Sequence, residues 1–198
     1  AAPRISAWLL SPQVQLREGV HAGAVAGAMD SAGRARYVYP EITGYYLHWL
    51  AEMHTDWARD DLALAASRAA DWSARQFDGG ALAKTRTYLG DDANDWRNDA
   101  VFFFDFAMLL RGLCAAAQAH LIELPHAVVR RLIEELDQFA GADGEVRAAR
   151  LLDAGATLPA RWSTLGGPFE VKACSRVLLA GRHAEVPAKL SAACEQLI

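Results

Sequence analysis

The sequence predicts an all-α protein built from tandem antiparallel helical hairpins. Three apolar segments share one pattern and recur at a nearly constant interval, which places Glu41, Asp105 and Glu170 at their equivalent starts. A short link and an amphipathic segment follow each of them, as expected for a buried inner helix and its outer partner. A constant return of this kind is typical of a helical repeat. We therefore predict essentially no sheet and a single domain over 1–198, with hairpins at about 40–77, 101–139 and 168–198.

The segment over residues 1–38 precedes the repeat. A short helical piece over residues 5–10 resembles the tail of an outer helix, and Ser11 and Pro12 stop it. Residues 18–38 are rich in glycine and alanine and show no helical period. They predict a long loop.

The first hairpin has the clearest helix signals. Residues 40–54 are apolar on nearly every face, with Pro40 suited to the first helical position and Glu41 beside the positive end of the helix dipole. Residues 59–77 place apolar side chains at spacings of three and four, and charged side chains on the opposite face. This amphipathic segment is the expected outer helix.

The scheme then repeats twice. Residues 101–119 are expected to form the second inner helix, and Pro125 is expected to begin an outer helix over 125–139. The third inner helix is expected at about 168–180, and a third outer helix follows Pro187. Because the long connections, about 18–38, 79–100 and 144–167, all lead into inner helices, they meet on the side where those helices begin. Loops of that length commonly bind something or line a site, so we expect a ligand on this side.

Composition excludes several classes of protein. Hydrophobic residues make up 53% of the chain, yet no uninterrupted apolar run is long enough to span a membrane. The net charge is −4 and the basic residues are scattered, so nucleic acid is not an expected partner. Three cysteines do not form a disulfide framework and are expected as reduced core residues. No leader pattern is visible at Ala1, so we expect a cytoplasmic protein, although a removed leader would give the same start.

Several short motifs resemble the six-hairpin (α/α) toroids, a group that includes glycoside hydrolases, sugar 2-epimerases, unsaturated glucuronyl hydrolases and terpenoid-cyclase-like repeat proteins. The resemblance covers about residues 38–198 and rests on the blocks Pro-Glu-Ile-Thr-Gly-Tyr at 40–45, Ala-Ala-Asp-Trp at 69–72, Asp-Gly-Gly at 78–80, Phe-Asp at 104–105 and Leu-Arg-Gly-Leu at 110–113. It implies a partial toroid, because three hairpins are visible where a closed ring has six. It also implies a glycan ligand at the N-terminal ends of the inner helices. The chain is then a fragment of a longer protein, or a half ring that another chain completes or that stays open. Apolar inner-helix surface at the open end predicts self-association or a partner chain.

Glu41, Asp105 and Glu170 occupy equivalent positions and are the catalytic candidates. In a toroid they would point toward a common axis, where paired carboxyl groups act as general acid and general base on a glycosidic bond. The alternative is that each acid only favours the helix dipole and satisfies free N–H groups of the first turn.

The candidates for substrate binding are loop or inner-helix residues with flat or charged side chains. The aromatic ones offer faces on which sugar rings can rest. Arg111 has a counterpart at Arg176, and both either pair with buried acids or reach the axis. His21 lies in a glycine-rich loop and is a candidate acid or base. The full set is His21, Tyr45, Tyr88, Trp96, Arg111 and Trp162.

No metal or cofactor is expected. The acidic run at 91–99 lacks the glycine and glutamate that a calcium-binding loop requires at its sixth and twelfth positions. The histidines and cysteines show no metal-binding spacing. The preferred hypothesis is therefore a carbohydrate-active hydrolase or epimerase. The alternative is a non-catalytic helical-repeat module that docks on a partner chain; isoprenoid cyclisation is less favoured because the acidic run lacks an Asp-x-Asp-Asp order.

Overall fold

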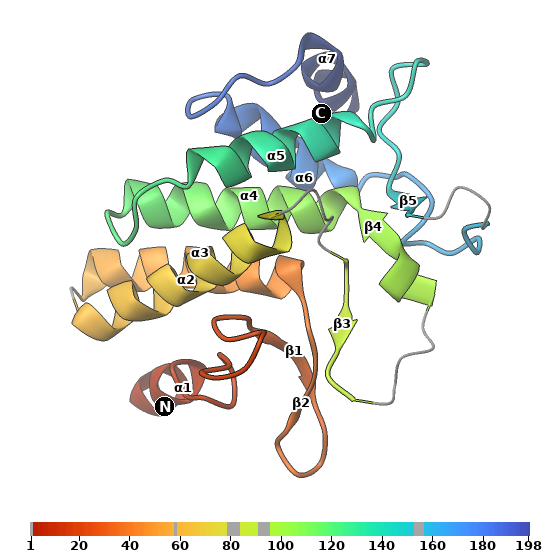
Figure 1. Ribbon diagram of the computed structural model, residues 1–198. Coiled ribbons are helices and arrows are strands. Elements are labelled where there is room, and N and C mark those ends of the chain that lie inside the picture. Colours follow the sequence, from red (N-terminus) through yellow and green to blue (C-terminus); the bar gives the residue numbers. More distant parts are fainter. Residues whose placement is uncertain (1, 58, 79–83, 91–95, 153–156) are drawn as a thin grey trace.

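The computed structural model describes residues 2–57, 59–78, 84–90, 96–152 and 157–198. Within these residues the helices from α2 to α7 form successive pairs, and small strands lie at one end of them (Figure 1). The helices are α1 (Ala2–Leu9), α2 (Pro40–Asp56), α3 (Asp60–Gln76), α4 (Phe103–Gln118), α5 (His126–Asp137), α6 (Glu170–Ala180) and α7 (Ala188–Leu197), with a short 3-10 helix η2 (Trp96–Asp99).

Two antiparallel sheets accompany the helices. The first has the order β1-β2-β3 and the second pairs β4 with β5. Their bounds are β1 (Ala26–Met29), β2 (Ala35–Val38), β3 (Thr87–Tyr88), β4 (Ala100–Phe102) and β5 (Ala149–Leu151).

The all-α prediction is therefore wrong, and the fold is mixed α/β. Four of the strands lie in segments that the sequence predicted as loops, and β4 replaces the expected first turn of the second inner helix. The physical reason is that long connections packed against a core must pair their backbone N–H and C=O groups. The first connection pairs with the second through β2 and β3, and the second pairs with the third through β4 and β5.

The inner helices α2, α4 and α6 lie side by side, with α4 in the middle. Their N-terminal ends are at the same end of the molecule, because the hydroxyl of Tyr39, just before α2, is 3.1 Å from Oδ1 of Asp105 in the first turn of α4. The outer helices α3, α5 and α7 each return along the inner helix that precedes them (Figure 1). The links between α4 and α5 and between α6 and α7 lie toward the left in that view, on the side away from β4 and β5.

Two glycines allow α2 and α4 to touch through their backbones. A Cβ atom on Gly112 of α4 would overlap the carbonyl oxygen of Gly44 in α2, and one on Gly44 would overlap that of Met108. No side chain larger than hydrogen fits at this crossing. The close approach brings the N-terminal ends of the two helices together.

The core lies between the inner and outer helices. Its largest fully buried side chains include Leu47, Leu50, Phe106 and Leu110 from inner helices and Leu132 from α5. Each such side chain contributes about 1.5–3 kcal/mol relative to an exposed one. All three cysteines are buried and free. No helix among the described residues combines the length and apolar character needed to cross a membrane.

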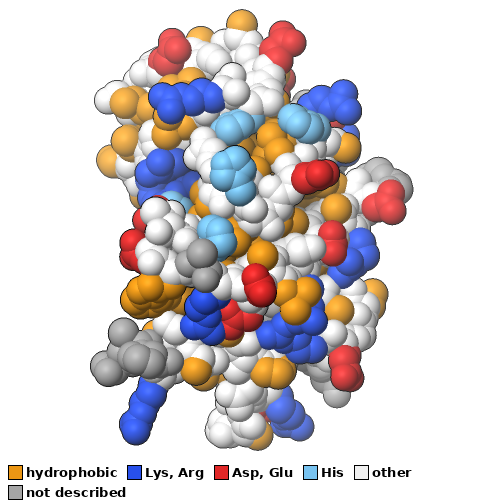
Figure 2. Space-filling view, turned by 90° about the vertical axis from the view of Figure 1, so that its left-hand side faces the viewer, with side chains coloured by type: hydrophobic (Ala, Val, Ile, Leu, Met, Phe, Trp, Pro, Cys, Tyr) orange, Lys and Arg blue, Asp and Glu red, His pale blue; other side chains and the backbone are white. Residues whose placement is uncertain are grey.

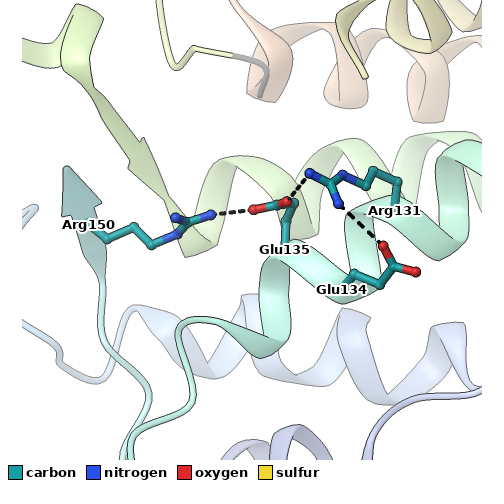
Figure 3. Close-up of polar contacts among 4 residues, drawn as sticks. All are labelled: Arg131, Glu134, Glu135 and Arg150. Atoms are coloured by element: carbon teal, nitrogen blue, oxygen red, sulfur yellow. Dashed lines mark hydrogen bonds and ion pairs between the residues drawn. The ribbon is translucent and has the colours of Figure 1, made fainter. Parts of the chain in front are cut away.

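A buried carboxylate connects α5 to the second sheet (Figure 3). Glu135 is 6% exposed, and its Oε1 is 2.8 Å from Nη2 of Arg131. Its other oxygen pairs with Arg150 of β5. Since β5 pairs with β4, which leads directly into α4, this ion pair positions the strand at the start of the middle inner helix.

We expect Glu135→Gln to lower the free energy of unfolding by about 2 kcal/mol. The substitution leaves two arginines without their buried counter-charge, although partial exposure of both guanidinium groups moderates the cost. Glu134→Gln is the matched control, because the neighbouring Glu134 side chain is 64% exposed and should change stability by less than about 0.5 kcal/mol. Urea denaturation measures both, and equal losses would contradict the assigned role of Glu135.

Candidate functional site

A pocket of about 660 Å³ opens where the three inner helices begin. This volume falls within the range of small-molecule sites. Each inner helix contributes one acid near its start, and the long connections supply the remaining wall. The lining includes Tyr39, Glu41 and Tyr45 from α2 and its cap, Phe104 and Asp105 from α4, Phe169 and Glu170 from α6 and its cap, and Thr85, Arg86, Arg97, Phe102, Arg161, Trp162 and Ser163 from the connections and β4.

Asp105 is held by residues from two other segments. It is 4% exposed; its Oδ1 accepts a hydrogen bond from the Tyr39 hydroxyl at 3.1 Å and its Oδ2 accepts one from Thr85 Oγ1 at 3.0 Å. Burial, followed by the negative charge of Glu41, raises the pKa of Asp105 well above its usual range. The side chain is therefore protonated far more readily than an ordinary aspartate.

Glu170 is buried without a partner. It is 1% exposed, and neither of its carboxyl oxygens has a hydrogen-bond partner among the described residues. Burial is the main cause that raises its pKa to about 8, and the neighbouring Cys174 and Asp105 act in the same direction. At neutral pH Glu170 therefore holds a proton and lies at a pocket wall, where a ligand can accept that proton.

Glu41 differs from the other two acids because it is only partly buried. Its charge raises the pKa values of both Asp105 and Tyr39. One pocket thus contains three carboxyl groups in unlike environments. This is the arrangement in which one carboxyl group donates a proton while another accepts one.

For Asp105 and Glu170, the explanation that the acids merely start helices fits this geometry poorly. The oxygens of Asp105 bond to Tyr39 and Thr85 rather than to N–H groups of its own helix. Glu170 is buried and has no hydrogen-bond partner among the described residues. The helix dipole alone does not offset the free-energy cost of burying such a group.

The pocket also contains cations that sequence reasoning missed. The guanidinium of Arg86 lies 4.8 Å from the ring centre of Tyr37 and 5.8 Å from that of Tyr39. Arg97 lies 4.9 Å from the ring of Trp96. With Arg161 they place positive charge near the three acids. Each of these arginines lies one or two positions from an aromatic residue in the sequence. That neighbour could have identified the arginine as a candidate for ligand binding.

The structure brings five of the nine sequence-predicted residues together at the pocket. Trp162 is 77% exposed and its ring lies 5.7 Å from that of Phe169, so it offers an open aromatic face. The five are Glu41, Tyr45, Asp105, Trp162 and Glu170.

Two further predicted aromatics lie behind the wall. The ring of Tyr88 is 5.2 Å from that of Tyr37, and Tyr88 hydrogen-bonds to Arg86. The ring of Trp96 is 6.1 Å from that of Phe102. These two side chains support pocket residues rather than line the pocket.

His21 and Arg111 lie elsewhere. His21 is beside α3, where burial and the charge of Arg75 lower its pKa. Arg111 lines a smaller cavity farther along the inner helices. In the part of the chain that the structure describes, no group of three or more histidine, cysteine or acidic side chains is placed to hold a metal ion. The acidic residues 91, 92 and 95 lie outside the described residues.

Comparisons with known proteins leave the site as the main guide to function. No protein-family model matches the chain, and neither curated proteins nor solved structures give a significant match. The fold and pocket define a mixed α/β protein with parallel inner helices and a carboxyl-rich pocket at their N-terminal ends.

Proposed function

We propose that this protein binds and hydrolyses a glycan in the pocket at the start of α2, α4 and α6. The observation that carries the proposal is Glu170, a buried carboxyl group with no partner among the described residues and a raised pKa, lying in a pocket with a second buried carboxyl group. A buried acid that stays protonated near neutral pH is suited to general acid catalysis.

Each carboxyl group has a distinct role in this proposal. Glu170 donates its proton to the glycosidic oxygen as the bond to the anomeric carbon breaks. Glu41, the most accessible of the three, removes a proton from the water that attacks that carbon. Asp105 is already bonded to Tyr39 and Thr85 and positions a sugar hydroxyl.

The other lining residues favour a glycan that carries anionic groups. Tyr45 and Trp162 present aromatic faces to sugar rings, and Arg86, Arg97 and Arg161 supply donors for carboxylate or sulfate oxygens. We also propose a cytoplasmic location, because all three cysteines are free thiols, the state that a reducing compartment maintains.

The test is a screen of acidic and neutral oligosaccharides, followed by assays of affinity and bond cleavage on the responding glycan. Glu170→Gln and Glu41→Gln should each reduce turnover by at least about 100-fold, because each removes one proton-transfer step. Affinity should change far less, since the amides keep the shape of the acids. Trp162→Ala should weaken affinity without unfolding the protein, because its side chain is largely exposed.

Glu185→Gln is the matched control, since it makes the same change at an exposed acid in the link between α6 and α7. It should leave turnover and affinity unchanged. If the pocket variants behave like this control, the glycan site is wrong. The remaining hypothesis is then the assembly module, which sedimentation would test through self-association.

A further inference from the structure

A second cavity of about 160 Å³ lies between the same three inner helices, farther toward their C-terminal ends. Its lining is rich in cationic or protonatable side chains from all three helices and from the segment after α6. They are His48, Arg111, Arg176, Arg182 and His183, with Gln118 beside them. Figure 2 views the molecule from the side of the short links and shows histidines gathered there with Lys and Arg side chains around them.

Arg111 and Arg176 face this cavity from equivalent places in the repeat, since each follows the acid of its own inner helix by the same interval. Among the described residues, neither has a hydrogen bond or an ion pair, and the Nε atom of each is buried without a hydrogen-bond partner. The one ring contact described for the pair is that of Arg111, whose guanidinium lies 5.9 Å from the ring centre of Tyr45. The sequence left open whether these arginines pair with buried acids, and in the described structure they do not.

The two guanidinium groups act on each other. Burial, and then the positive charge of Arg176, lowers the pKa of Arg111. The acid that faces the group is Glu52, whose side chain is 74% exposed and lies 3.7 Å from Nδ1 of His48. One exposed carboxylate does not neutralise three arginines, so the cavity has an excess of positive charge.

His183 extends the cluster with a polar contact. Its Nε2 is 2.9 Å from Nε2 of Gln118 on α4. The pKa of His48 is lowered by burial and by Arg111, so this ring is a neutral hydrogen-bonding group near pH 7. The cavity therefore combines positively charged guanidinium groups with neutral hydrogen-bond donors and acceptors.

We propose that this cavity binds a small oxyanion of the phosphate type between Arg111 and Arg176. The guanidinium fork matches two oxygens of a tetrahedral anion, and a bound dianion would remove the repulsion between the arginines. The cavity volume suits one phosphate group and little else. The anion is either free inorganic phosphate or the phosphate group of a small ester whose remainder points outward.

The full chain is titrated with inorganic phosphate by calorimetry and by thermal unfolding, against chloride at equal ionic strength. We expect saturable binding and an increase in Tm of about 3 °C or more at saturation. Arg111→Gln and Arg176→Gln should each weaken phosphate binding at least tenfold. Arg130→Gln, which removes the same charge from the exposed face of α5, should bind phosphate normally.

A second measurement separates a binding role from a structural one. Without phosphate, Arg111→Gln should unfold at the same temperature as the parent protein or higher, because it relieves repulsion; a structural arginine would lower Tm. Glycerol phosphate distinguishes the sources, since tighter binding than that of phosphate favours an ester and weaker binding favours the free anion. No response beyond that to chloride, or full binding in both variants, would overturn the site. Glu170→Gln should still bind phosphate, so this test is independent of the glycan pocket.

Discussion

Gly112→Ala should lower the free energy of unfolding by about 3 kcal/mol or more, among the largest effects of any single methyl group in this protein. The new Cβ would overlap the carbonyl oxygen of Gly44, and backbone on both sides prevents a simple side-chain adjustment. The helices α2 and α4 must move apart, which also separates Glu41 from Asp105. Urea denaturation followed by circular dichroism measures the loss.

The expected loss of stability in Gly112→Ala is opposite in sign to the usual effect of this substitution in a helix. Replacing glycine by alanine inside an unhindered helix stabilises a protein by up to about 1 kcal/mol. Gly90→Ala is the control, because a Cβ at this exposed loop position meets nothing within 4 Å. It should be neutral or slightly stabilising. A Gly112→Ala protein as stable as the parent would show that the two helices do not touch there.

The second large effect is a loss of stability as the pH rises from about 5 to 8.5. The pKa of Glu170 is about 8 in the folded protein and its ordinary value is 4.5. Between these values the folded state holds a proton that the unfolded state has released, so the free energy of unfolding falls with increasing pH. The full shift corresponds to about 3–5 kcal/mol at 1.36 kcal/mol per pKa unit. Asp105 shifts in the same direction and adds to the slope.

Glu170→Gln should remove much of this slope, because the amide resembles the protonated acid and does not titrate. The variant should therefore be the more stable protein at pH 8.5 and nearly equal to the parent at pH 5. Denaturation at the two pH values measures this difference, with Glu185→Gln as the exposed control. An unchanged slope in Glu170→Gln would mean that another group holds the proton.

Sequence reasoning reached the helices and the acids because both depend on local pattern. The nearly constant return of that pattern identified equivalent positions, and the acids at those positions lie in one pocket. The strands were missed because they are very short, too short for an alternating pattern to appear. The strands form because connections that are far apart in the sequence pair through backbone hydrogen bonds, as β2 and β3 do at Tyr37 and Tyr88.

The pocket arginines were missed for a related reason. A neighbouring aromatic marks Arg86 or Arg161 as a candidate, but nothing local says that the two will meet at one cavity. The connections that carry them are brought together only when the helices pack. The assignment to glycan chemistry and the expected second chain stay predictions.

The sequence by itself determined the hairpin spacing, the order of inner and outer helices, and the equivalence of Glu41, Asp105 and Glu170. Only the tertiary structure decided that these acids are chemically different. A carboxyl pKa depends on burial and on neighbouring charges, and here those neighbours come from far along the chain. Asp105 bonds to Tyr39 and Thr85, whereas Glu170 has no partner at all among the described residues.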